Sequence, residues 1–285
     1  MATTLNIAAL SRRTGIAPDT LRKWEQRYGI LKPSRTSGGQ RRYSERDVAR
    51  IEWLRDRLDE GYRISEAAHI LGGAETDPAR RAEELPDLVL AALAENDSGR
   101  LSSLLDQTFA LLPLERAAVE VVAPVLERVG RGWQAGTISV AQEHLLTGKV
   151  RARLDQLAAD PHGTVRGTAV LACAPGERHD LGLLMLAVLL GAEGWHVEYL
   201  GADMPVAQTL ALAAAVDADV ICISVVGAAS AARLRSELAD RAIAAGIPIV
   251  IGGAAANDVL AAEVGARYVD GDVAAAARRL REHAR

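Results

Sequence analysis

A histidine with carboxylates and a glycine nearby, at residues 177–182, has the composition of a metal or cofactor site. The segment reads Glu177-Arg178-His179-Asp180-Leu181-Gly182. A neutral imidazole nitrogen is a common metal ligand, and a carboxylate that accepts the other ring N–H fixes the tautomer. Either Glu177 or Asp180 is placed to accept that hydrogen bond, and Gly182 allows a ligand to approach closely. An ordinary loop histidine is the alternative, so the rest of the chain has to decide.

A second group of such side chains lies upstream, where Trp133 is followed after nine residues by Glu143-His144. The intervening Gln134-Ala135-Gly136 predicts a loop between two helices. Such a loop would let the indole cover a ligand while the carboxylate and imidazole reach it from the next helix. The alternative is a tryptophan that anchors a bundle corner and a glutamate at a helix N-terminus.

The N-terminal region contains side chains suited to nucleic acid. A predicted helix over 18–28 follows a short helix and a glycine turn, and a Gly/Ser-rich wing follows over 32–43. A helix in the major groove reads base edges, whereas a basic wing contacts phosphate. Trp24 lies on the same helix and either packs in the core or contacts DNA. The expected DNA-binding residues are Thr20, Arg22, Lys23, Arg27, Arg35, Arg41, Arg42 and Tyr43.

The charge distribution agrees with that expectation. Residues 1–63 contain fourteen basic and eight acidic residues, whereas the remainder contains nineteen basic and twenty-nine acidic ones. A basic head on an acidic body is typical of a protein that meets nucleic acid. A solvated basic face is the alternative reading of the same charges.

The elements that must position His179 are predicted by five apolar runs. The runs cover 168–172, 196–200, 220–224, 247–251 and 267–269, and helical stretches separate them. Near-continuous apolar strands alternating with helices predict a parallel, doubly wound sheet. Ligands bind such sheets at the carboxyl ends of the strands. His179 follows the first strand, Ser224 ends the third, and Gly252-Gly253 follows the fourth, so we expect all of them at that edge.

Three domains follow from these patterns. A winged helix-turn-helix covers 1–75, a four-helix bundle covers 79–160, and a five-stranded Rossmann-like or flavodoxin-like α/β domain covers 164–285. Glycine-rich and proline-containing segments at 72–78 and 160–163 are the predicted linkers. No apolar stretch reaches the ~20 residues of a membrane span, and the start has no signal-peptide pattern. With Cys173 and Cys222 in buried-type strands, we expect a cytoplasmic protein without a membrane partner.

Residues 5–71 resemble the N-terminal domain of MerR-type regulators. The matching residues are Ile7-Ala-Ala-Leu-Ser, Thr14-Gly15, Thr20-Leu21-Arg22-Lys23-Trp24-Glu25, Tyr28-Gly29, Lys32-Pro33, Arg35 and Gly38-Gly39-Gln40-Arg41-Arg42-Tyr43. This resemblance implies that Arg22 and Lys23 lie near the bases and that Arg41, Arg42 and Tyr43 lie near phosphate.

The C-terminal residues resemble the B12-binding fold, whose usual pattern is Asp/Glu-x-His-x-x-Gly, Ser-x-Leu and Gly-Gly. Here the pattern is Glu177-x-His179-x-x-Gly182, then Ser224 and Gly252-Gly253, with Val226 in place of the leucine. The resemblance implies that His179 ligates cobalt from below and displaces the dimethylbenzimidazole tail. The tail then lies beside the serine and the glycine pair.

Together with these two domains, the Trp-x9-Glu-His pattern resembles the CarH/LitR-type regulators, which are photoreceptors that bind adenosylcobalamin. The resemblance implies that Trp133, Val140 and Glu143 surround the 5′-deoxyadenosyl group, with His144 close by. A histidine often follows the tryptophan in that family and captures cobalt after illumination. Here the residue is Gln134, an amide that ligates cobalt poorly, which puts a bis-histidine photoproduct in doubt.

We therefore hypothesise a light-responsive repressor, not an enzyme, that oligomerises on operator DNA in the dark and leaves it on illumination. The sequence leaves open a dimer or a tetramer, and an adenosyl or a methyl upper ligand. One rival is a B12-dependent methyltransferase or mutase, for whose catalytic barrel the chain has no room. A second rival is a regulator that senses cobalamin without light, or that does not bind cobalamin.

Overall fold

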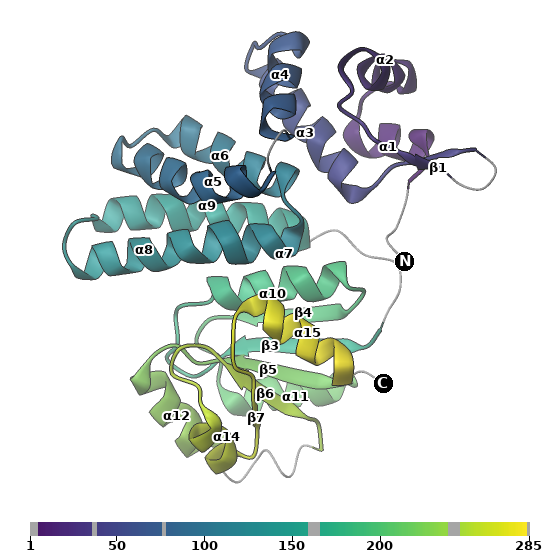
Figure 1. Ribbon diagram of the computed structural model, residues 1–285. Helices are drawn as coiled ribbons and strands as arrows, with labels where there is room; N and C mark the ends of the chain where they lie inside the picture. The colour runs from purple at the N-terminus through teal and green to yellow at the C-terminus, as the bar shows by residue number, and fades with distance from the viewer. Residues whose placement is uncertain (1–4, 36–38, 76–77, 159–165, 239–245, 284–285) are drawn as a thin grey trace. The chain divides into compact units, whose positions relative to one another are not determined.

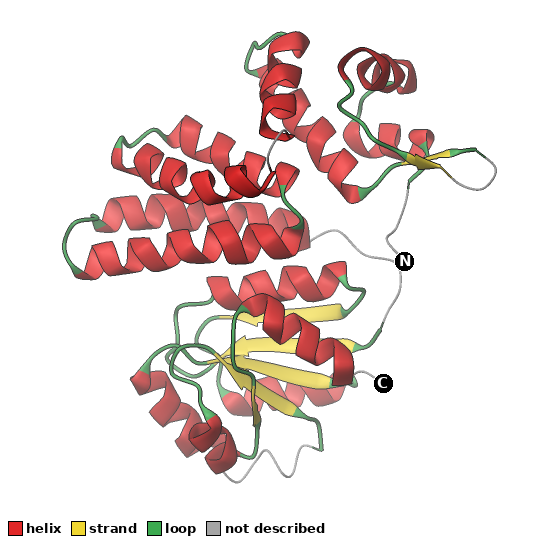
Figure 2. Cartoon of the chain, viewed as in Figure 1, coloured by secondary structure: helices red, strands yellow, loops and turns green. Residues whose placement is uncertain are grey.

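The computed structural model describes residues 5–35, 39–75, 78–158, 166–238 and 246–283 (Figures 1 and 2). The chain divides into two compact units, Met1–Gln142 and Glu143–Arg285, each of which is described by itself. Within the ranges given above, no helix has both the length and the apolar character that crossing a membrane requires.

The first unit begins with the predicted winged helix-turn-helix. Helices α1 (Ile7–Thr14) and α2 (Pro18–Tyr28) are joined at Gly15, whose φ of 74° suits glycine. Strands β1 (Ser34–Arg35) and β2 (Arg41–Arg42) pair antiparallel and form the wing. Helices α3 (Glu45–Asp59) and α4 (Ile64–Glu75) follow. Gly72 and Gly73 therefore lie inside α4, where we had predicted a linker.

Local sequence accounts for where α3 begins. The Ser44 side chain accepts a hydrogen bond from the Asp47 N–H, and the Asp47 carboxylate accepts one from the Ser44 N–H. This capping box satisfies two backbone donors that the first turn of a helix leaves unpaired. The sequence predicted this start, with aspartate taking the place of the usual glutamate.

One apolar cluster holds the head together and extends into the next helices. Leu10, Leu21, Trp24 and Ile51 are buried in it, together with Leu111 of helix α6. Trp24 is 8% exposed, so of the two alternatives left open above, packing is the one observed. Because α3 also packs against α6, the head and the helices after it form one packed unit.

Residues 78–158 form the four predicted helical segments. These are α5 (Pro78–Ala94), α6 (Ser98–Leu111), an uninterrupted run of α7 (Leu114–Arg116), the π-helical η1 (Ala117–Val122) and α8 (Ala123–Gln134), and finally α9 (Val140–Ala158). In the π-helical section the N–H of Ala123 donates to the carbonyl of Ala118, five residues back. Pro124 follows immediately, and a proline cannot donate the α-helical bond. The wider turn just ahead of it was not predicted.

The second unit contains the predicted parallel sheet, which has five strands and the order β4-β3-β5-β6-β7. The strands are β3 (Thr168–Cys173), β4 (His196–Gly201), β5 (Val220–Ser224), β6 (Ile249–Gly252) and β7 (Arg267–Tyr268). Helices α10 (Leu181–Ala192) and α15 (Val273–His283) cover one face, and α11 (Val206–Ala215), α12 (Ala228–Leu238) and α14 (Asp258–Val264) cover the other (Figure 1).

The strand order explains where a ligand would bind. Strand β3 lies between β4 and β5, so the chain reverses its winding direction there. In doubly wound sheets the ligand crevice lies at the carboxyl ends of the strands beside such a reversal. The loops after β3 and β5 are therefore the positions where site residues are expected.

Candidate functional site

Backbone contacts with two neighbouring segments hold the loop between β3 and α10, residues 174–180. The N–H of Ala174 donates to the carbonyl of Ser224 at 2.9 Å. The N–H of Gly176 donates to the Asp203 carboxylate, and the Asp203 N–H donates back to the carbonyl of Glu177 at 2.8 Å. The first half of the loop is therefore held before any side chain of the site is considered.

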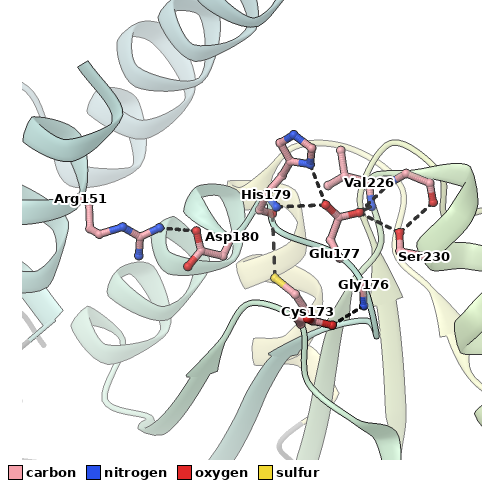
Figure 3. A network of polar contacts seen from close by, with 10 residues as sticks. Arg151, Cys173, Gly176, Glu177, His179, Asp180, Val226 and Ser230 are labelled. Atoms are coloured by element: carbon pink, nitrogen blue, oxygen red, sulfur yellow. Dashed lines mark hydrogen bonds and ion pairs between the residues drawn. The ribbon is translucent and has the colours of Figure 1, made fainter. Parts of the chain in front are cut away.

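His179 projects from this loop with its ring largely exposed. The side chain is 78% exposed, and Nδ1 lies 2.6 Å from Oε1 of Glu177 (Figure 3). A carboxylate at this distance accepts a hydrogen bond from Nδ1–H, which leaves Nε2 unprotonated with its lone pair available. Of the two carboxylates that the sequence offered, Glu177 is thus the one that orients the imidazole. The result is a histidine prepared to ligate a metal through Nε2.

Glu177 is itself buried, with 2% of its surface exposed. Oxygen Oε2 accepts from the N–H groups of Val226 (2.9 Å) and Gly227 (2.7 Å) and from the hydroxyl of Ser230 (2.8 Å). Oxygen Oε1 also accepts from the N–H of His179 at 3.0 Å. One carboxylate therefore ties the loop after β3 to the loop after β5, across the reversal of the sheet (Figure 3).

The surroundings of Glu177 keep it ionised. Burial raises the pKa of the carboxyl, but the hydrogen bonds from His179, Ser230 and Gly227 outweigh burial and lower the pKa to about 2. Hydrogen bonds to a charged carboxylate favour the charged form. Gly227 and Ser230 were missed by sequence reasoning, because their separation from Glu177 along the chain follows no local period.

A serine and two glycines lie at the strand ends beside this network. The φ of Gly253 is 105°, and a Cβ there would lie 2.5 Å from the carbonyl oxygen of Val225. Gly253 therefore permits a close approach that other residues would prevent. Ser224 and Gly252 end the paired strands β5 and β6 at the same edge. A Cβ at Gly182 would meet no atom within 4 Å, so that surface is open.

Asp180 faces away from the histidine. Its carboxylate forms an ion pair with Arg151 of α9 (Figure 3). It also accepts a hydrogen bond from the hydroxyl of Tyr199 at 3.0 Å. Two acidic residues of one short loop are thus directed to different elements. Glu177 bonds to the loop after β5, and Asp180 bonds to α9 and β4.

In the first unit, two large apolar side chains at the end of α8 and the start of α9 remain exposed. Trp133 is 50% exposed and Val140 is 53% exposed. The turn between them is tight, because a Cβ on Gly132 would lie 2.7 Å from Cδ1 of Ile138. A half-exposed indole does not serve as a buried corner anchor, which weakens that alternative. Exposed apolar side chains of this kind suit a surface that a ligand covers.

Glu143 and His144 lie one turn into α9, in the second unit. Their side chains are 27% and 74% exposed, and the His144 Nε2 lies 3.3 Å from a Glu143 oxygen. Gln134, the last residue of α8, is exposed. The polar members of the predicted motif are therefore accessible to a ligand.

The head presents a basic face on α2. Arg22, Lys23 and Arg27 are exposed, and Thr20 is partly buried. Arg22 pairs with Asp19 at 2.7 Å. Exposed cations at these spacings lie on one side of a helix, which is the arrangement that groove binding requires.

In the wing, Arg35 lies in β1, Arg42 is half-buried in β2, and Arg41 is exposed. Arg41 Nε lies 2.8 Å from Glu25 of α2. Tyr43 also donates to Glu25, at 2.9 Å, and is fully buried. The expected contact of Tyr43 with phosphate is thus corrected, because its side chain has no surface to offer. Burial, together with the hydrogen bond, raises the pKa of Tyr43 to about 12.

Three family models match parts of the chain. Residues 5–73 match the MerR HTH family of regulatory proteins, and residues 86–158 and 167–280 match two models of B12 binding domains.

Two whole-length relatives are transcriptional repressors of Myxococcus xanthus. The HTH-type transcriptional repressor CarH is 40% identical over 89% of this chain and 89% of its own length. The HTH-type transcriptional repressor CarA is 33% identical over 94% of this chain and 93% of its own length. Among solved structures, the monomethylamine corrinoid protein of Methanosarcina barkeri is similar in fold. Its TM-score is 0.58 at 20% identity, and the match covers 70% of this chain and 98% of that one.

Proposed function

Because the chain belongs to the MerR-type, B12-binding transcriptional repressors related to CarH, we propose that it is a light-responsive repressor that uses adenosylcobalamin as its chromophore. The observation that most supports a cobalamin site is the presentation of His179, whose exposed ring is held at Nδ1 by a buried carboxylate. We assign DNA reading to residues 1–75, the upper side of the cofactor to 79–160 and its lower side to 164–285.

On the lower side, His179 would ligate cobalt through Nε2 while Glu177 keeps the proton on Nδ1. Ser224, Gly252 and Gly253 would accept the nucleotide tail, because they lie at the carboxyl edge of the sheet, where β5 and β6 end. Gly182 leaves room beside the ligating histidine. These residues bind and orient the cofactor, and they need no rearrangement of the Glu177 network to do so.

On the upper side, Trp133 and Val140 would cover the adenosyl group with apolar surface, and Glu143 and His144 would contact its polar atoms. The bound cofactor supplies a cobalt–carbon bond that visible light breaks. Without that group, Trp133 and Val140 would lie open to water, which would favour a different arrangement of the residues around them.

On DNA, the exposed residues of α2 would read bases: Thr20, Arg22, Lys23 and Arg27. The wing arginines would contact phosphate: Arg35, Arg41 and Arg42. We propose that the dark form is a homo-oligomer, dimer or tetramer, because paired heads raise the effective concentration at paired half-sites. Illumination would dissociate it and release the operator.

The test combines the purified chain with adenosylcobalamin in the dark, and compares it with a His179→Ala variant. Absorption spectra and gel filtration are recorded before and after green light. The proposal expects a bound cofactor in the wild type and a smaller particle after illumination, with both lost in the variant. A wild-type chain that does not bind cobalamin would refute the proposal. Methylcobalamin in a parallel sample identifies the preferred upper ligand.

A second candidate, a cobalamin sensor that does not respond to light, is favoured by Gln134. The amide at this exposed position is a poor cobalt ligand, so the lit state has no histidine directly after the tryptophan to stabilise it. Unchanged particle size after illumination, with cobalamin bound, would support this candidate. A Gln134→His variant that gains the size change would identify this residue as the cause.

A further inference from the structure

Asp180 directly follows His179, and its side chain bonds neither the histidine nor the first turn of helix α10, which begins after it. Its side chain is 9% exposed, and as the N-cap of α10 it makes no capping hydrogen bond. The carboxylate is directed instead to the guanidinium of Arg151 (Figure 3) and to the hydroxyl of Tyr199. A buried carboxylate is costly unless it is paired, so this position depends on those two partners.

Tyr199 makes the attachment point rigid. Its hydroxyl lies within hydrogen-bond distance of both the Asp180 carbonyl oxygen (3.2 Å) and the Asp180 carboxylate (3.0 Å). The same carbonyl accepts the first α-helical bond of α10, from the N–H of Leu184 at 2.9 Å. Arg151 therefore binds a point that is held by both β4 and α10, rather than a loose side chain.

Arg151 lies on the same face of α9 as two of the residues proposed to contact the cofactor. His144 lies seven residues before Arg151 and Val140 lies eleven before it, which place all three within about 20° of one helix face. Both His144 and Val140 are exposed. The face of α9 that offers side chains to a ligand is therefore the face that Arg151 attaches to the residue next to His179.

We propose that Arg151 is a positioning residue, whose ion pair with Asp180 holds α9 in register with the His179 loop. Resting on the proposed function, this inference means that Glu143 and His144, on the part of α9 that lies in the second unit, are held at a fixed place relative to the lower cobalt ligand. Glu177 cannot do this, because both of its oxygens are occupied by the loop after β5 and by His179.

The first experiment needs no cofactor. Hydrogen exchange of the full chain without cobalamin is compared among wild type, Arg151→Met, Arg151→Lys, Asp180→Asn and Arg235→Met. Loss of one partner is expected to speed exchange at 143–158 and 180–184 by about tenfold, the scale of one charge-assisted bond. Lysine should restore part of the protection. Arg235→Met, which breaks an ion pair with Glu263 elsewhere in the second unit, should leave these amides unchanged. Unchanged exchange in Arg151→Met would overturn the proposal.

The second experiment measures adenosylcobalamin affinity in the dark, with the double variant Arg151→Met/Asp180→Asn added. Each single variant is expected to bind about tenfold more weakly, and the double variant no more weakly than either, because both break one pair. The spectroscopic signature of histidine ligation should persist in all three. Undiminished affinity in a variant with faster exchange would overturn the positioning role. If wild type does not bind cobalamin, the proposed function fails, whereas the exchange result still reports on the ion pair.

Discussion

The Glu177 network and the Trp133–Val140 corner are built in opposite ways. Around Glu177 the carboxylate is buried and both oxygens are bonded, so His179 is oriented without a ligand. At the corner, Trp133 and Val140 remain about half exposed. The comparison indicates that one side of the proposed site is complete in the folded chain, whereas the other offers surface that a ligand would cover. Substitutions in the Glu177 network should affect folding and binding together, whereas substitutions at the Trp133–Val140 corner should affect binding alone.

The largest effect is expected from Glu177→Ala. The substitution leaves the N–H groups of Val226 and Gly227 and the hydroxyl of Ser230 without the oxygen that they share. Loss of a residue that orients a ligand typically costs about 10–100-fold in affinity, and orphaned buried donors add about 1–3 kcal/mol each in stability. Cobalamin titration and thermal unfolding should both change. Wild-type affinity in this variant would contradict a lower side completed by Glu177.

Trp133→Ala should separate binding from stability. Because the indole is half exposed, we expect the free energy of unfolding to change by less than about 0.5 kcal/mol. Affinity for adenosylcobalamin should fall by about tenfold, as expected when an apolar contact with a ligand is lost. Hydroxocobalamin, which lacks the adenosyl group, should bind with unchanged affinity.

Two valines provide a matched pair for the same corner. Val140 and Val259 are both exposed, at 53% and 67%, but only Val140 belongs to the proposed upper side. Val140→Ala should weaken adenosylcobalamin binding by about threefold, the scale of a small loss of apolar contact, whereas Val259→Ala should not. Equal effects in the two variants would show that the corner is ordinary surface.

Low pH should destabilise the Glu177 network by protonating Glu177. Its pKa in the folded chain is lowered to about 2 from an ordinary value of 4.5, so the folded state binds this proton more weakly than the unfolded state. Its stabilisation is therefore present above about pH 4.5 and is lost as the pH falls toward 2. The Tm of the wild type should fall more steeply across that window than the Tm of Glu177→Gln. Parallel pH profiles would argue against an ionised, network-bound Glu177.

The smallest effect concerns the thiols beneath the network. Burial raises the pKa of both Cys173 and Cys222 to about 12, so neither forms appreciable thiolate at pH 8. A thiol reagent should label the unfolded chain fully and the native chain very slowly, with or without cobalamin. Rapid labelling of Cys173 in the native chain would show that the Glu177 network opens, because Cys173 lies just before the loop that bears Glu177.

Much of the fold was predictable because its signals are local. Apolar runs alternating with helical stretches predicted the five-stranded parallel sheet, and therefore placed His179, Ser224 and Gly252-Gly253 at one edge. Ser44 and Asp47 predicted the start of α3. The exposed cations of α2 followed from the helical period, because neighbours within one helix are determined by residue spacing alone.

The tertiary structure decided which residues far apart in the sequence bind one another, because no helical or strand periodicity relates them. Glu177 bonds Val226 and Ser230, 49 and 53 residues away, because β3 and β5 are adjacent in the sheet. Asp180 bonds Arg151 because the fold of the second unit brings α9 beside the loop that follows β3. Tyr43 is buried against Glu25 because the wing folds back onto α2, although the sequence reads as an exposed basic segment. Sequence by itself determined which residues reach the sheet edge, but strand order and helix packing determined which of them meet, since both depend on contacts between distant segments.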